Sequence, residues 1–372
     1  MKKIILAPNS FKGSLSSQEA CAVMKKAVLA ADPDCQIVEM PVSDGGEGFA
    51  DRFLGCYGGT KITVATSDAR GRPLTSYYVC LPDGTAIVEL ALTAGLHLAG
   101  SHPDPATATT YGVGTVLCQA ARAGAKKILI GLGGSATNDG GCGLASAIGV
   151  RFTNAAGAPF VPVGATLSQI AAIDVTGIDP AFANVEIRVA CDVDNPLTGR
   201  TGAAQTFARQ KGADPAMTDR LEAGLCAYAS LLRYQYHFES EFPGAGAAGG
   251  TTVALKLFLN AVIERGIDVV LDAIGFNDAL LDTDAVFTGE GRLDSQSFGG
   301  KALAGILARA GRQGIPVVAF AGRLDGLSMD HLPPVLTAIA ITEAAIYLND
   351  AIIGASKYLY DAVFRYCKYR FK

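Results

Sequence analysis

Short apolar segments alternate with longer segments of mixed polarity along most of the chain. "KIILAP" (residues 3–8) has the continuous apolar character of a buried strand, and the stretch after it leads into a helix-like pattern. That helix is expected to begin near Ser16, because Ser16 and Glu19 have the spacing of a capping box. The alternation returns near the C-terminus, in "DAVFTG" and "PVVAFAG". This order of elements predicts an α/β fold with a mostly parallel sheet.

The pattern changes between residues 61 and 90, where three strand-like runs follow one another. The last two are joined by a Pro-Asp-Gly turn at residues 82–84, so a meander is expected there. We therefore predict two α/β domains. Residues 1–65 and 275–372 form a mostly parallel, Rossmann- or flavodoxin-like sheet built from both chain ends, and residues 66–274 form an inserted domain with a mixed sheet.

Composition narrows the range of functions. A chain of 372 residues has room for about two domains, and 49% hydrophobic residues supply ample core. A net charge of −4 gives no general attraction to nucleic acid or to an anionic membrane, and no apolar run approaches the length of a membrane span. Nine scattered cysteines without a C-x-x-C pair suit reduced thiols. We expect a cytoplasmic protein that binds neither nucleic acid nor membrane.

A glycine-rich loop, "GLGGSATNDGG" (residues 131–141), lies between a predicted strand and a predicted helix. Its start has the form G-x-G-x-x-A, whose backbone N–H groups can cradle an anion. A dinucleotide-binding dehydrogenase is one interpretation, but an acidic residue is then expected about 20 residues further on, where this chain has Asn154. A purely structural loop is another interpretation. The candidate cofactor-binding residues are Gly133, Gly134, Ser135, Asn138 and Asp139.

Two turns near the N-terminus carry charged side chains after predicted strands. In "APNSFKGSLS", Ser10 and Lys12 lie between a strand end and a helix start. A lysine there can meet a phosphate or carboxylate, although a solvated surface lysine is the alternative. In "SDGGEG", Asp44 and Glu47 can ligate Mg²⁺ directly or through water, but the same spacing fits a helix cap.

Two later segments also combine glycines with charged or polar side chains. "ACDVDNPLTG" offers oxygen atoms of Asp192, Asp194 and Asn195 to a hard cation, or forms an Asx-turn. "TGEGRLDSQSFGGKA" holds acids and bases together. These are Glu290, Arg292, Asp294 and Lys301. Such a mixture suits phosphoryl transfer, in which cations bind phosphates and carboxylates serve the metal and the acceptor hydroxyl. An ordinary charged loop is the alternative.

Taken together, these segments resemble the type I glycerate kinases. The matching motifs, in family order, are "APNSFKGSLS", "PVSDGGEGF", "TTYGVGTVL", "GLGGSATNDGG", "ACDVDNPLTG", "QKGA", "PGAGAAGG" and "TGEGRLDSQSFGGK". The resemblance implies a cytoplasmic kinase that uses ATP and Mg²⁺ to phosphorylate D-glycerate, in bacteria usually at the 2-hydroxyl. The product is then 2-phosphoglycerate, with 3-phosphoglycerate as the alternative that the sequence leaves open. The resemblance also implies two α/β domains with the active site in the cleft between them. A homo-oligomer is compatible with it.

Within this interpretation the charged residues receive roles. Lys12 or Arg292 is expected to hold the substrate carboxylate, with Ser10 nearby, and Lys301 to hold the transferring phosphate. Asp294 is our choice for the base, so Asp294, Lys301 and Arg292 form the catalytic group. The metal ligands are expected to be Asp192, Glu290 and Asp44.

Three departures from the family pattern bear on the substrate. The family usually has Asp where this chain has Asn9, Thr where it has Phe49, and Gly-Pro where it has Ala208-Arg209. Asn9 replaces a carboxylate by a neutral amide, Phe49 can narrow a pocket, and Arg209 adds a cation that favours a more anionic ligand. A kinase of another small hydroxy or sugar acid is therefore an alternative, and a non-catalytic acid-binding protein is a further one.

Overall fold

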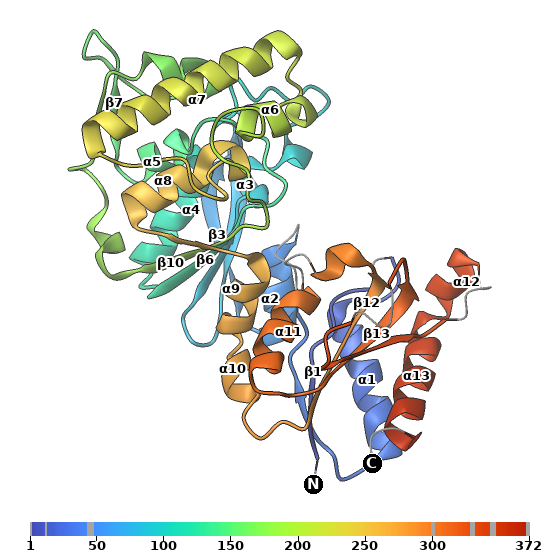
Figure 1. Ribbon diagram of the computed structural model, residues 1–372. Helices are drawn as coiled ribbons and strands as arrows, with labels where there is room; N and C mark the ends of the chain where they lie inside the picture. The colour runs from blue at the N-terminus through green and yellow to red at the C-terminus, as the bar shows by residue number, and fades with distance from the viewer. Residues whose placement is uncertain are drawn as a thin grey trace. The chain divides into compact units, whose positions relative to one another are not determined.

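The computed structural model describes residues 2–11, 13–42, 48–298, 302–327, 332–342 and 347–369. The chain divides into two compact units (Figure 1). The terminal unit comprises Met1–Asp44 and Gly266–Lys372, and the central unit comprises Gly45–Arg265. Both chain ends therefore build one unit and the middle of the chain builds the other.

The boundaries between the units differ from those expected at residues 65/66 and 274/275. Residues 45–65 belong to the central unit because β3 (Thr60–Ser67) pairs along its whole length with β4 (Pro73–Cys80). Residues 266–274 belong to the terminal unit because Ile267 and Leu271 of α9 (Gly266–Ala273) are buried in its core. Pairing and burial with residues distant in sequence decide both boundaries.

The terminal unit holds a parallel sheet with the order β14-β13-β12-β1-β2 in its described residues. Numbered along this unit alone, the strand order is 2-1-3-4-5, which is the flavodoxin-like order. The predicted flavodoxin-like parallel sheet from both chain ends is confirmed. Its elements are β1 (Lys3–Leu6), α1 (Ser17–Ala31), β2 (Gln36–Glu39), α9 (Gly266–Ala273), α10 (Phe276–Ala279), β12 (Ala285–Leu293), α11 (Ala302–Arg312), β13 (Val317–Leu324), β14 (Leu336–Ala340), α12 (Leu348–Ile353) and α13 (Ala355–Tyr369).

Helices cover both faces of this sheet. α1 and α13 lie side by side on one face, where Ile4 and Phe287 point into their core cluster (Figure 1). α9 and α11 cover the other face, where Ile5 and Val286 are buried. The capping box predicted at the start of α1 is present, since Ser16 Oγ accepts a hydrogen bond from the Glu19 N–H and the Glu19 carboxylate accepts one from the Ser16 N–H.

The central unit is built on a mixed sheet with the order β11-β10-β6-β5-β4-β3 in its described residues. β5, β6, β10 and β11 are parallel, and β4 and β3 add antiparallel strands at one edge, so the predicted meander is confirmed. The remaining elements are α2 (Phe49–Tyr57), β5 (Ala86–Glu89), α3 (Ala91–Ala94), α4 (Tyr111–Arg122), β6 (Lys127–Gly131), α5 (Cys142–Ala147), β7 (Arg151–Thr153), β8 (Pro159–Phe160), β9 (Ala172–Asp174), β10 (Glu186–Ala190), α6 (Ala203–Phe207), α7 (Pro215–Tyr236), α8 (Thr251–Leu259) and β11 (Val262–Glu264).

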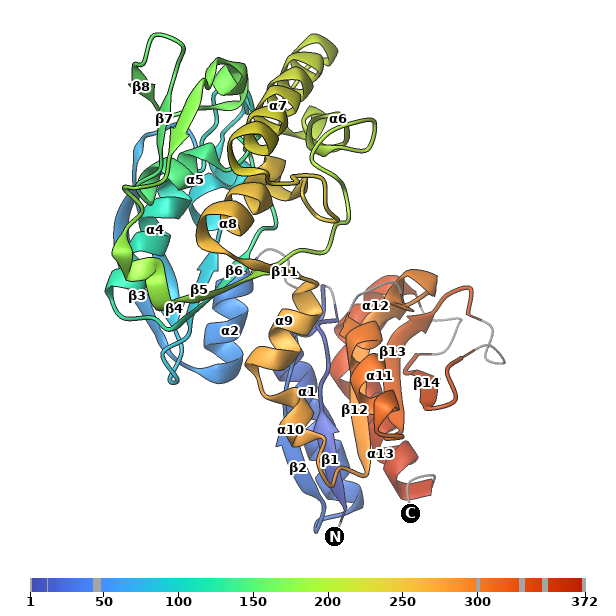
Figure 2. The same ribbon diagram turned by 60° about the vertical axis from the view of Figure 1, so that its left-hand side comes forward.

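Alternate residues of β6 show which helices cover which face of this sheet. Ile128 and Ile130 belong to the core beneath α4, α5 and α8, which lie side by side (Figure 2). Gly131 is on the other face of the sheet, because successive residues of a strand alternate between faces, and there it lies against the Phe49 ring of α2. In the part of the chain that the structure describes, no helix is long and apolar enough to cross a bilayer.

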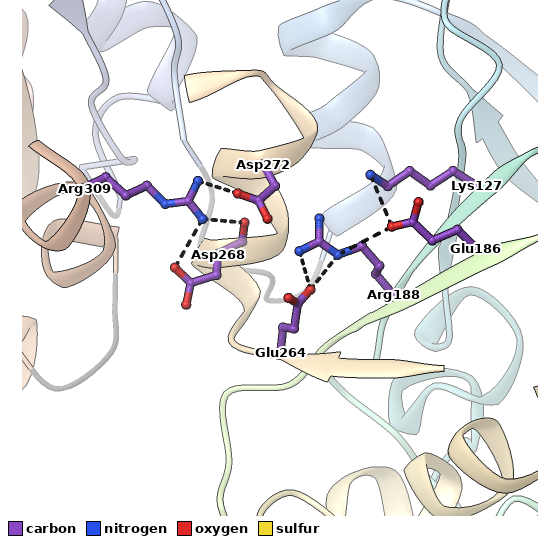
Figure 3. Close-up of polar contacts among 7 residues, drawn as sticks. All are labelled: Lys127, Glu186, Arg188, Glu264, Asp268, Asp272 and Arg309. Carbon is purple, nitrogen blue, oxygen red and sulfur yellow. Dashed lines mark hydrogen bonds and ion pairs between the residues drawn. The ribbon is translucent and has the colours of Figure 1, made fainter. Parts of the chain in front are cut away.

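Each unit also contains a network of ion pairs, and the residues of both networks are drawn in Figure 3: Lys127, Glu186, Arg188, Glu264, Asp268, Asp272 and Arg309. In the central unit the Arg188 guanidinium on β10 lies 2.6 Å from the Glu264 carboxylate on β11. In the terminal unit Arg309 of α11 pairs with two carboxylates of α9 (Figure 3). The Arg188 and Arg309 side chains are about nine-tenths buried, so these pairs are screened little by solvent and hold neighbouring elements together.

Candidate active site

The central unit has a pocket of about 410 Å³ where two of its parallel strands end. Gly131 at the end of β6 is directly opposite Ala190 at the end of β10, and the loops that follow both strands line the pocket. Its lining residues are Leu96, Leu132, Gly133, Gly134, Ser135, Ala190, Cys191, Asp192, Val193, Phe207, Gln210, Lys211, Ala247 and Ala248. Ligands of α/β proteins bind at the carboxyl ends of parallel strands, and this volume is ordinary for a small-molecule site.

The glycine-rich loop after β6 forms one side of this pocket. A Cβ at Gly131 would lie 2.8 Å from the Phe49 ring, so that glycine serves packing between the strand and α2. Gly134 has φ = +71°, a conformation that favours glycine, and its carbonyl accepts a hydrogen bond from the Leu96 N–H. Phe49 itself is fully buried and does not line the pocket. Its size therefore affects the core beneath the loop.

Asp139 is an internal anchor of the loop. Its carboxylate is fully buried and accepts hydrogen bonds from Thr110 N, Thr110 Oγ1, Gly141 N and Gly143 N, at 2.7–3.2 Å. Burial raises the pKa of this carboxyl, while the four donors act in the opposite direction. Asn138 is also fully buried, and within the described residues neither atom of its amide has a hydrogen-bond partner. Of the five candidate cofactor residues, Gly133, Gly134 and Ser135 line the pocket, whereas these two do not.

The segment "PGAGAAGG" (residues 243–250) packs directly against the glycine-rich loop. Gly140 N donates a hydrogen bond to Gly249 O at 2.9 Å. A Cβ at Gly249 would lie only 2.2 Å from Thr137 O, so the two glycine-rich segments are in direct backbone contact. Ala247 and Ala248 of the same segment line the pocket. The glycines of this motif thus bring two loops together beside the pocket.

Lys211 is a buried cation in the pocket wall. It is not among the candidate site residues given above, although "FARQKGA" offers it, with Arg209 and Gln210, as a partner for an anion. Lys211 is the last residue of the short 3-10 turn Arg209–Lys211. Its Nζ donates hydrogen bonds to Ser135 Oγ (2.9 Å) and to Thr137 O (2.7 Å). Burial lowers the pKa of this lysine to about 8, and the nearby Asp139 carboxylate acts in the opposite direction. The sequence gives no sign that Lys211 is buried, because lysines of such a segment are more commonly solvated charges.

Asp192 and Asn195, which follow β10, have different environments. The Asp192 side chain is exposed and lines the pocket. The Asn195 amide instead donates to Thr201 O at 2.7 Å and to Thr206 Oγ1, and so closes its own loop. Among the described residues, no group of three or more His, Cys, Asp or Glu side chains is arranged to hold a metal ion.

In the terminal unit, Asn9 follows β1, which is paired with β12, and the chain continues from these two strands to opposite faces of the sheet. β1 leads to α1 on one face of the sheet and β12 leads to α11 on the other, which is the topological switch point of this fold. Asn9 and Glu290 line a small hollow there. Asn9 Oδ1 accepts a hydrogen bond from the Ser10 N–H at 2.8 Å, which an aspartate would accept equally well. The substitution therefore preserves this bond and removes a charge.

Arg292 and Asp294, expected to act together, are in contact. Arg292 Nε lies 3.2 Å from Asp294 Oδ2, and its Nη2 lies 2.9 Å from Asp325 Oδ2. Asp325 was not among the candidates, yet the sequence carries a signal for it, because "GRLD" occurs at both 291–294 and 322–325. The two copies are aligned across β12 and β13, with Arg292 opposite Arg323. The other candidates, Lys12, Asp44 and Lys301, lie outside the described residues.

Comparisons with known proteins agree on one family. The model of the glycerate kinase family matches residues 4–369. The glycerate kinase of Bacillus subtilis (strain 168) is 39% identical over 363 residues, covering 96% of this chain and 94% of the relative. The glycerate 2-kinase of Escherichia coli (strain K12) is 37% identical over 367 residues, covering 98% and 95%. A crystal structure named for glycerate kinase 2 of Salmonella typhimurium LT2 superposes with a TM-score of 0.86 at 36% identity, covering 98% of this chain and 96% of that one. The chain belongs to the glycerate kinase family and is a kinase.

Proposed function

We propose that the protein transfers the γ-phosphoryl group of ATP to a hydroxyl of D-glycerate, with Mg²⁺, and releases ADP. The observation that carries this proposal is the 410 Å³ pocket with the glycine loop and a buried lysine in its wall, in a chain of the glycerate kinase family. The Escherichia coli relative is a glycerate 2-kinase by name, which favours the 2-hydroxyl as acceptor and 2-phosphoglycerate as product over 3-phosphoglycerate.

The nucleotide is assigned to the pocket of the central unit. Gly133, Gly134 and Ser135 supply backbone and hydroxyl groups on one side of it. Asp192 supplies an exposed carboxylate, and carboxylate oxygens are the ligands that Mg²⁺ prefers. Glu290 and Asp44 remain the further metal ligands of the proposal. Bound Mg²⁺ neutralises charge on the phosphate oxygens during transfer.

The acceptor is assigned to the strand ends of the terminal unit. Arg292 offers a planar guanidinium that can bind the glycerate carboxylate with two parallel hydrogen bonds. It now binds Asp294 and Asp325, so a substrate carboxylate would take the place of one of them. Asp294 is the proposed base that accepts the proton of the attacking hydroxyl. Ser10 and Lys12 complete the substrate site, and Lys301 holds the transferring phosphate.

A coupled assay of ADP release, run with D-glycerate and with a panel of small hydroxy and sugar acids, tests this function. We expect Mg²⁺-dependent release with D-glycerate, and ³¹P NMR of the product then distinguishes 2-phosphoglycerate from 3-phosphoglycerate. ADP release with another acid, and none with D-glycerate, would identify that acid as the substrate in place of D-glycerate. Binding of D-glycerate and ATP without release would overturn the kinase assignment in favour of an acid-binding protein.

A further inference from the structure

Among the residues that the structure describes, Lys211 forms no ion pair with a carboxylate. Only 3% of its surface is exposed, and the two acceptors of its ammonium, Ser135 Oγ and Thr137 O, are both uncharged. In the described part of the chain it forms no ion pair and has no further polar contact. An ammonium group carries three hydrogens, so one donor remains beyond these two bonds.

The nearby buried carboxylate does not fill this role. Asp139 influences Lys211 electrostatically, but its carboxylate accepts hydrogen bonds from Thr110, Gly141 and Gly143, whereas the Lys211 ammonium donates to Ser135 Oγ and Thr137 O. Burying a cation among neutral acceptors costs free energy, because the ammonium loses its hydration and neutral groups replace that hydration only partly. Since Lys211 lines the pocket, a ligand in that pocket can supply the missing negative charge.

The shape and lining of the pocket indicate which ligand this is. Leu96, Leu132 and Phe207 give it apolar surface, whereas Ser135 and Lys211 form a polar part. Glycerate has three carbons, each bearing oxygen, and so no apolar part to match the first set. A nucleotide has both a flat base and charged phosphates. We propose that Lys211 binds the phosphate groups of the nucleotide, and that Ser135 and Thr137 hold its ammonium in position.

This proposal rests on the proposed function and adds a consequence of its own. The pKa of Lys211 is about 8 without ligand, because burial favours the neutral amine. Among the described residues, Asp139 is the titratable group that acts on Lys211 electrostatically. Asp192 and Cys191 are titratable residues of the same pocket lining, and burial raises the pKa of the Cys191 thiol. A phosphate beside Lys211 favours the charged form and raises that pKa. Nucleotide binding at pH 8 should therefore take up about half a proton per site.

Substitution of the lysine tests the contact directly. Lys211→Met removes the charge and keeps most of the side-chain volume. Lys126→Met is the matched control, because Lys126 is exposed and precedes β6 at the opposite end from the pocket. Loss of one charge-assisted contact should weaken ADP binding about 10- to 150-fold in Lys211→Met. Lys126→Met should bind ADP with the affinity of the unsubstituted protein. In both variants the KM for D-glycerate should stay within about threefold of the value for the unsubstituted protein.

Calorimetry on the unchanged protein tests the proposal without any risk of misfolding. ADP is titrated at pH 8 in the presence of Mg²⁺, in buffers with different ionisation enthalpies, and the slope of the heat gives the number of protons taken up. We expect about half a proton at pH 8, about a tenth at pH 7, and no uptake assigned to this site in a folded Lys211→Met variant. D-glycerate titrated in the same way should take up none at this lysine.

The outcomes separate this proposal from the function on which it rests. If the unchanged protein neither binds ADP nor turns over, the proposed function fails. If it turns over but ADP binding takes up no proton and survives Lys211→Met within threefold, only the role of Lys211 fails. Proton uptake with D-glycerate instead of ADP would also overturn the assignment, because it would place the carboxylate of the acceptor beside this lysine.

Discussion

Lys211→Met should change how the stability of the unliganded protein depends on pH. In the folded protein burial lowers the pKa of Lys211 from its ordinary 10.5 to about 8. Below pH 8 the lysine is protonated in both folded and unfolded chains, so the full cost of burying its charge is present. Between pH 8 and 10.5 the unfolded chain binds more protons than the folded chain, and stability therefore rises with pH.

The size of the effect follows from the same shift. Lowering a pKa from 10.5 to about 8 corresponds to about 3 kcal/mol, at 1.36 kcal/mol per pKa unit. Buried thiols oppose it at high pH, because Cys118 has a pKa of about 11 and Cys367 one of about 12, both above the ordinary thiol value. These thiols are present in both proteins. The difference between unchanged protein and Lys211→Met cancels them and isolates the lysine.

Urea unfolding followed by circular dichroism from pH 7 to pH 10 is the suitable assay, since the chain contains no tryptophan. The free energy of unfolding of the unchanged protein, minus that of Lys211→Met, should rise by about 2–3 kcal/mol over this interval. A difference that stays constant within about 0.5 kcal/mol would mean that Lys211 keeps an ordinary pKa. The reasoning from its burial would then be wrong.

Three further substitutions test the residues around the two strand-end sites. Asp139→Ala leaves the four donors from Thr110, Gly141 and Gly143 without their acceptor and should lower the free energy of unfolding by about 3–5 kcal/mol, measured by urea unfolding, with faster hydrogen exchange at Gly143 as the local sign. Arg292→Ala should raise the KM for D-glycerate about 10- to 150-fold and leave the KM for ATP nearly unchanged; the reverse pattern in steady-state kinetics would place Arg292 on the nucleotide. Asp192→Asn should lower kcat by at least about 100-fold while the circular dichroism spectrum stays the same, because it removes a proposed Mg²⁺ ligand. Near-normal turnover of that variant at limiting Mg²⁺ would contradict the metal assignment.

Much of the architecture could be read from local patterns. The apolar runs, the meander turn and the Ser16–Glu19 capping box all depend on residues close together in sequence, and the structure confirms each of them. The parallel sheet from both chain ends follows from strand–helix alternation at each end. Local spacing is sufficient for these elements because helix caps, tight turns and side-chain alternation each depend on residues a few positions apart.

Tertiary structure decided which charged groups are buried, and with what partners. Lys211 reaches Ser135 across 76 residues and Asp139 reaches Thr110 across 29, and neither contact leaves a periodic trace in sequence. Asp325 joins Arg292 only because β12 and β13 are adjacent and in register. The unit boundary likewise depends on β3 pairing with β4. The sequence determined the elements and the family, whereas the burial of single charges depended on loops that the sheets bring together. The reason is that every neighbour in space contributes to the desolvation of a charge, and not only its neighbours along the chain.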